Sequence, residues 1–118
     1  MDIRVKTFAA EARSRFGVAL EGLGFASPEV DQSQETYPLV MHVRYHRGDV
    51  TVDTSLVLAY AGEEYVHTSL LWAGASPSRA RSVTVGEDTA HTGYQMRRAL
   101  DKHAQAAPDL ITRRDCGD

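Results

Sequence analysis

Apolar residues recur at steps of three and four between Ile3 and Leu23, which is the spacing of one face of an α-helix. Asp2 stands where a helix-capping residue is expected. Gly24 followed by Phe25 is typical of a helix stop in which glycine takes the left-handed conformation. The pattern therefore predicts an amphipathic N-terminal helix over residues 3–23.

From residue 37 the apolar period changes from about 3.6 to 2. Odd positions are apolar up to residue 45, and even positions are apolar from residue 50 onward, as in two half-buried strands. The apolar faces of these strands merge only if the loop between them holds an even number of residues. We therefore predict a β-hairpin with Arg47-Gly48 as a two-residue turn, and a four-residue loop as the alternative.

Three further segments bear on the extent of the sheet. Residues 26–35 are polar and contain a proline, which indicates a surface loop, although Val30 could instead join a strand. Residues 65–72 alternate again, and their parity favours an odd loop of three residues with Gly62 in a bulge. Residues 82–85 are a candidate for a short fourth strand.

The C-terminal part of the chain predicts a second helix over residues 88–107, ended by Pro108. Residues 112–118 are predicted to be a flexible tail, so a single domain covers residues 1–111. An antiparallel meander of three or four strands with one apolar face needs a cover, which two amphipathic helices supply. The predicted fold class is α+β, in two layers with both helices on one sheet face.

Composition places the chain among ordinary globular proteins. It has 118 residues, of which 42% are hydrophobic and 25% charged, enough for one core. We expect no membrane span, because no apolar run reaches the ~18 residues that a bilayer requires. Charges throughout the N-terminal segment and the single Cys116 predict a cytoplasmic protein without disulfides.

Charge is unevenly distributed along the chain. The net charge is -3, but residues 26–76 carry seven carboxylates against two arginines, a net of -5. An acidic middle segment suits a basic partner and argues against nucleic acid. The arginines of the second helix lack interleaved aromatic residues for base stacking, so they predict a solvated helix face.

Two short motifs have structural explanations. Arg47-Gly48-Asp49 matches the integrin-binding tripeptide, but a glycine between two alternating strands is what a tight turn requires. The GLGF segment at residues 22–25 matches the carboxylate-binding loop of PDZ domains. Here it follows a helix and precedes a polar segment, so it is predicted to be a helix stop.

Histidines raise the question of a metal site. His42 and His46 are four residues apart, which on a strand separates them by about 13 Å at 3.3 Å per residue, too far to share an ion. In the two-residue register His42 lies opposite Asp53 and His46 opposite Asp49. These pairs predict exposed cross-strand contacts on the polar face of the sheet.

No metal, cofactor or catalytic residue is assigned. His91 and His103 are predicted to lie on the exposed face or edge of the second helix. A small enzyme is one alternative, since a His42–Asp53 dyad could serve as an oriented general base, but the sequence supplies neither a third group nor a pocket.

Over most of its length the chain resembles the immunity-type and uncharacterised helix-meander-helix domains found in bacteria beside secreted toxins. The resemblance rests on the step Gly24-Phe25, on the alternating segment VMHVRYHRGDVTVDTSLVL, and on Pro108-Asp109-Leu110 near the end. It implies a non-enzymatic protein that binds and blocks a protein partner, for which a basic target would be electrostatically suited.

The predicted functional residues fall into two sets. One is a charged binding surface: His42, Arg44, His46, Asp49, Asp53, Glu63 and Glu64. The other is Leu70-Leu71-Trp72, apolar on both faces of its strand and therefore a candidate interface. The second set favours an alternative function, a homodimeric adaptor or chaperone-like protein that uses an apolar sheet edge.

Overall fold

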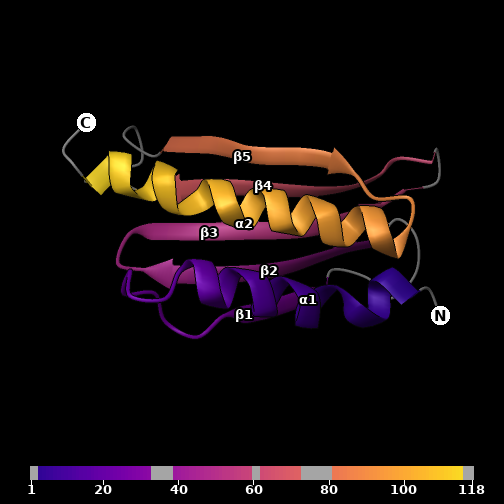
Figure 1. Ribbon diagram of the computed structural model, residues 1–118, viewed down its shortest axis with the longest axis horizontal. Coiled ribbons are helices and arrows are strands. Elements are labelled where there is room, and N and C mark those ends of the chain that lie inside the picture. Colours follow the sequence, from indigo (N-terminus) through magenta and orange to yellow (C-terminus); the bar gives the residue numbers. More distant parts are fainter. Residues whose placement is uncertain (1–2, 33–38, 60–61, 73–80, 116–118) are drawn as a thin grey trace.

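A computed structural model describes residues 3–32, 39–59, 62–72 and 81–115 of the chain. The elements are α1 (Ile3–Ala19), β1 (Glu29–Gln32), β2 (Leu39–Arg47), β3 (Val50–Leu58), β4 (Glu64–Trp72), β5 (Arg81–Thr89) and α2 (Gly93–Asp115). The strands form one antiparallel sheet in chain order. Both helices lie on the same face of it (Figure 1). The predicted two-layer α+β class is confirmed, with five strands where three or four were predicted.

The hydrophobic core lies between the sheet and the helices. α1 contributes Phe8, Ala12 and Phe16 at four-residue steps, and α2 contributes Met96 and Leu100, all of them fully buried. α1 packs on β2 and β3, whereas α2 packs on β4 and β5, so the two helices share the cover of one face. The inward strand residues are Leu39, Met41, Val43, Tyr45, Val50, Val52, Leu56, Leu58, Val66 and Leu70, which the alternating pattern had placed on one side.

α1 ends at Ala19, four residues before the predicted end. The N–H of Leu23 donates to the carbonyl of Leu20 at 3.1 Å, a tighter turn than the α-helical one. Gly24 has the predicted left-handed conformation, with a φ of 88°, but the helix has already ended at Ala19, so the predicted stop at Gly24 lies too far along the chain. The predicted cap at Asp2 lies outside the described residues.

α2 begins at Gly93, five residues later than predicted, because β5 occupies the preceding segment. The prediction that Pro108 ends this helix is wrong, since α2 continues to Asp115. A proline removes one N–H from the helical ladder. Ile111 beyond it is fully buried in the core, and this packing keeps the following turn in place. Residues 112–115, predicted as part of a tail, therefore belong to the helix.

The β2–β3 hairpin has the predicted even loop, but its two turn residues are Gly48 and Asp49. Gly48 has a φ of 58°, which fits the first central position of a type II′ turn. Arg47, predicted to be in the turn, stays in β2 and places its guanidinium 5.1 Å from the centre of the Phe25 ring. The register is thus shifted by two residues from the prediction, which leaves each side chain on its predicted face.

The second hairpin has the predicted odd loop. The N–H of Ala59 donates to the carbonyl of Glu63 at 3.0 Å, which leaves three residues between them, and Gly62 has a φ of 82°. β5 then pairs along the length of β4, with a shift of register at Thr68 and Ser69. The strand predicted at 82–85 is therefore present and longer, and β4 is an interior strand.

Candidate functional site

The sheet face opposite the helices carries most of the predicted binding residues. Within the described part of the chain neither helix lies on this face (Figure 1), and we call it the open face. Strand registers set its side chains in rows that cross the sheet. Its members are Glu29, Asp31, Val40, His42, Arg44, His46, Thr51, Asp53, Ser55, Val57, Tyr65, His67, Ser69, Leu71, Ser82, Thr84, Glu87 and Thr89.

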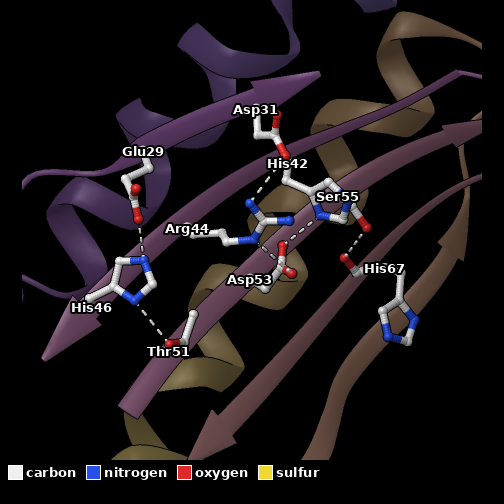
Figure 2. Close-up of polar contacts among 9 residues, drawn as sticks. All are labelled: Glu29, Asp31, His42, Arg44, His46, Thr51, Asp53, Ser55 and His67. Atoms are coloured by element: carbon white, nitrogen blue, oxygen red, sulfur yellow. Dashed lines mark hydrogen bonds and ion pairs between the residues drawn. The ribbon is translucent and has the colours of Figure 1, made fainter. Parts of the chain in front are cut away.

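Arg44 lies at the centre of a charged cluster on the open face. Its Nε donates to Asp53 Oδ2 and its Nη1 to Asp31 Oδ2, each at 3.4 Å. The other oxygen of Asp53 lies 3.0 Å from His42 Nδ1. Figure 2 shows these four side chains converging from β1, β2 and β3. Asp53 is the least exposed of them, with 16% of its side chain accessible, because two neighbours cover it.

A second cluster surrounds His46, which lies in the row of side chains next to that of Arg44. His46 Nδ1 lies 3.0 Å from Thr51 Oγ1, and its Nε2 contacts Glu29 Oε1 (Figure 2). A carboxylate can only accept hydrogen bonds, so Nε2 carries a proton and donates to Glu29. Glu29 and Asp31 both come from β1, which makes this short edge strand the source of two of the carboxylates on the open face.

The third histidine of the open face lies on β4. His67 Nδ1 is 3.0 Å from Glu87 Oε1 of β5, and the Ser55 hydroxyl donates to the His67 backbone carbonyl at 3.3 Å. Figure 2 shows the His67 ring turned away from the Arg44 cluster. The open face therefore holds three separate histidine–carboxylate contacts, which have no carboxylate in common.

The predicted cross-strand pairs of this face need correction. His42 lies opposite Ser55 and His46 lies opposite Thr51, because the turn is one residue further along than predicted, which shifts the register by two residues. His42 still reaches Asp53, but along a diagonal, whereas His46 does not pair with Asp49, which lies in the turn. The contacts of Asp31 and Glu29 were missed, since only one apolar residue hinted at β1.

The open face is acidic when its imidazoles are neutral. The described strand residues on this face include four carboxylates, on Glu29, Asp31, Asp53 and Glu87, and one guanidinium, on Arg44. Every carboxylate contacts an imidazole or the guanidinium. Among the described residues no group of three or more histidine, cysteine, aspartate and glutamate side chains is arranged to hold a metal ion.

Glu64 of the predicted binding set faces the helix side of the sheet. It accepts a hydrogen bond from Arg4 Nη2 at 3.2 Å and lies 2.8 Å from His91 Nδ1. The contact with His91, and after it that with Arg4, holds the pKa of the Glu64 carboxyl below its ordinary value. Glu63 lies in the adjoining loop. The predicted set is thus divided between the open face and two ends of the sheet.

The predicted apolar interface is also divided. Leu70 is 1% exposed and belongs to the core, so it is not available to a partner. Trp72 packs against that core, half-buried, and Leu71 lies on the open face opposite Thr51. The expectation of an apolar sheet edge at these residues is wrong, because β5 covers β4.

A buried chain of polar side chains, which the sequence pattern did not predict, lies on the helix side. Thr54 Oγ1 lies 2.8 Å from Thr68 Oγ1, which lies 2.7 Å from His103 Nδ1. His103 Nε2 lies 2.8 Å from Asp88 Oδ2. Both threonines are fully buried and His103 is 1% exposed, which corrects its predicted place on the exposed side of the helix. We call these four residues the buried polar chain.

The buried polar chain has the contacts of an acid–histidine–hydroxyl triad but not the access. A hollow of about 750 Å³ between α2 and β5 reaches Asp88, yet its lining includes neither His103 nor Thr68. A substrate therefore has no route to the hydroxyl. Inward threonines at positions 54 and 68, each flanked on that side by apolar residues two positions away, were the available signal.

Comparisons of the chain with protein-family models, with curated proteins and with solved structures found no match. Among the described residues, none of the helices combines the length and the apolar character that crossing a bilayer demands.

Proposed function

We propose that this chain is a non-enzymatic protein-binding domain whose open face binds a basic partner protein. The observation that supports the proposal most is a sheet face that no described helix covers and whose described strand residues carry four carboxylates against one guanidinium. Beside these charged residues Val40, Val57 and Tyr65 form a partly exposed apolar row across three strands. Aromatic side chains and arginine are enriched at protein interfaces.

The contacts within the open face are weak enough to be exchanged for contacts with a partner. Exposed ion pairs contribute about 0–1 kcal/mol, and the Asp31 and Glu29 side chains are 57% and 68% exposed. Lysine or arginine side chains of a partner can approach these carboxylates without unfolding anything. Excess negative charge also accelerates the encounter with a basic protein. An immunity-type inhibitor of a basic toxin would work in this way.

The sheet edges are less suited to binding. β1 has four residues and two carboxylates, and β5 is bulged against β4 and carries charges at Arg81, Glu87 and Asp88. Short edges, bulges and charges all oppose the addition of another strand. These features favour the open face over the homodimeric edge-binding alternative.

The enzyme alternative has less support. His42 and Asp53 are within hydrogen-bond reach, but Asp53 is shared with Arg44. Four hollows in the described surface are lined by other residues. Catalysis requires a site that positions a substrate and excludes water, and an uncovered sheet does neither.

Site-specific crosslinking locates the partner. We expect a photoreactive phenylalanine analogue at Ser69, in the middle of the open face, to crosslink a basic protein in extracts of the source organism. The same analogue at Gln105, exposed on α2, is the control and is expected to give no such product. Crosslinking from position 105 alone would contradict the proposal.

Charge variants then test the face with the purified partner. Neutralising Asp31 and Glu87 together, as Asn and Gln, is expected to raise the Kd about tenfold, since two lost charge contacts amount to about 1.4 kcal/mol. The matched control neutralises the exposed Glu21 and Asp109 and makes the same change in net charge. It is expected to change the Kd less than about twofold by the same relation. Equal losses in the two variants would argue against binding at the open face.

A further inference from the structure

We propose that the buried polar chain is an acid-sensitive latch: it holds α2 on the sheet while His103 is neutral and releases the helix when His103 takes up a proton. Its members come from four elements: Thr54 from β3, Thr68 from β4, Asp88 from β5 and His103 from α2. No other polar side chains of the helices and strands are as deeply buried as the two threonines and His103, within the residues that the structure describes.

The direction of the hydrogen bonds follows from their acceptors. The Asp88 carboxylate can only accept, so His103 Nε2 carries the proton and donates to it. Nδ1 of the neutral ring is then an acceptor, and the Thr68 hydroxyl donates to it at 2.7 Å. Thr68 in turn accepts from Thr54 at 2.8 Å. With a neutral ring, each of these three contacts has one donor and one acceptor.

Protonation of Nδ1 disrupts this order. The new N–H points at the proton of the Thr68 hydroxyl, so both threonines must rotate their hydroxyls inside a fully buried site. Burial disfavours the charged ring and lowers the pKa of His103 from its ordinary value. The hydrogen bond and charge of Asp88 oppose this shift of the pKa. The charges of Lys102 and His67 add to it. Asp88 of β5 faces His103 directly, Lys102 adjoins it on α2, and His67 lies on the other face of β4.

The ring has no room to reach water while α2 stays in place. Gly86 of β5 lies directly against it, and a Cβ at that position would stand under 3.0 Å from ring atoms of His103. The imidazole therefore packs on the bare backbone of β5. Hydrating a charged His103 requires α2 to move away from the strand, which links the protonation of one residue to the position of a helix.

The sign of the pH dependence follows from linkage. A folded pKa below the ordinary value of about 6.5 means that His103 binds the proton more tightly when α2 is released from the sheet. The form with α2 on the sheet is therefore fully favoured above about pH 6.5, and it loses stability as the pH falls below that value. Asp88 contributes stability that is lost only at lower pH, because the pKa of its carboxyl is also lowered, chiefly by the hydrogen bond with His103.

Hydrogen exchange of the whole chain tests the latch. Between pH 7.5 and 5.5, after correction for intrinsic rates, we expect amides of residues 96–111 in α2 to lose more protection than those of β2, by up to about tenfold. A factor of about ten is the limit that linkage sets one pH unit below 6.5. His103→Gln supplies one donor for Asp88 and one acceptor for Thr68 but does not titrate, so this difference should disappear. His46→Gln, on the open face, should keep it.

Several results would overturn the latch. Equal acceleration in α2 and β2 would indicate global unfolding, and an effect on α2 that persists in His103→Gln would assign it to another group. If that variant does not fold, the ring signals of His103 in the unchanged protein decide the matter by NMR titration. A midpoint at or above 6.5 with α2 still protected would exclude the mechanism, whereas titration only as α2 opens would support it.

Discussion

Replacing Gly86 with alanine is expected to lower the free energy of unfolding by about 3 kcal/mol, the upper part of the range for an overpacked core. The added methyl would stand under 3.0 Å from the His103 ring. That ring is tied to Asp88 and Thr68 at 2.8 and 2.7 Å, so it cannot turn aside without breaking a buried hydrogen bond. Chemical denaturation monitored by circular dichroism measures the loss.

A second substitution separates this clash from an effect on the backbone. With His103→Ala already present, the three atoms nearest to a Cβ at position 86, all in the His103 ring, are gone, and the additional cost of Gly86→Ala should fall below about 1 kcal/mol. Such a coupling between neighbours is what a double-mutant cycle detects. Gly93→Ala is the matched control, because a Cβ at Gly93 comes no nearer than 3.3 Å, to the end of the flexible Arg97 side chain. A Gly86 variant as stable as the Gly93 variant would refute the close packing of His103.

The parts of the fold that were predictable are those in which burial repeats along one element. Alternation in residues 39–45 and 50–58 correctly assigned the inward faces of β2 and β3, because a strand half covered by helices has a period of 2. β1 was harder to predict, since all four of its residues are exposed and leave no period. The end of α2 was mispredicted because Pro108 is a local signal, while Ile111 is held by the tertiary core.

Alternation along β2 and β3 predicted His42, Arg44, His46 and Asp53 on the open face, but it predicted neither their contacts nor the carboxylates that β1 and β5 add. A turn at Gly48-Asp49 or at Arg47-Gly48 satisfies the same parity, so the sequence could not choose between registers two residues apart. The register decides whether His42 lies directly opposite Asp53 or diagonally across from it on the neighbouring strand. The buried polar chain needs positions from four elements at once, which no periodicity along a single element reveals.

Replacing Arg4 with methionine is the second change expected to have a large effect. Arg4 is 7% exposed, and its Nη1 donates to the carbonyl of Ala90 at 2.7 Å while its Nη2 reaches Glu64 at 3.2 Å. These contacts tie the start of α1 to β4 and to the segment that leads into α2. Methionine keeps the apolar stem but leaves a buried carbonyl and a carboxylate without this donor. We expect a loss of about 2–4 kcal/mol.

The pH dependence of that loss gives a more specific test. The pKa of Glu64 is lowered, first by His91 and then by Arg4, so its ionised form contributes stability above the ordinary carboxyl range. This contribution is lost as the pH falls through the folded pKa. The difference in stability between the unchanged protein and Arg4→Met should accordingly narrow in acid, whereas a loss caused by packing alone would stay constant.

Arg15→Met provides the control in the same helix. Arg15 makes ion pairs with Glu11 and Asp101 at 2.6 Å, and the Asp101 side chain is 54% exposed. Solvent-exposed pairs contribute only about 0–1 kcal/mol, so Arg15→Met is expected to cost less than about 1 kcal/mol in the same denaturation experiment. The contrast arises because a hydrogen bond to a buried carbonyl cannot be replaced by water. Similar losses from the two variants would mean that water reaches the Ala90 carbonyl and that Arg4 is a surface residue in solution.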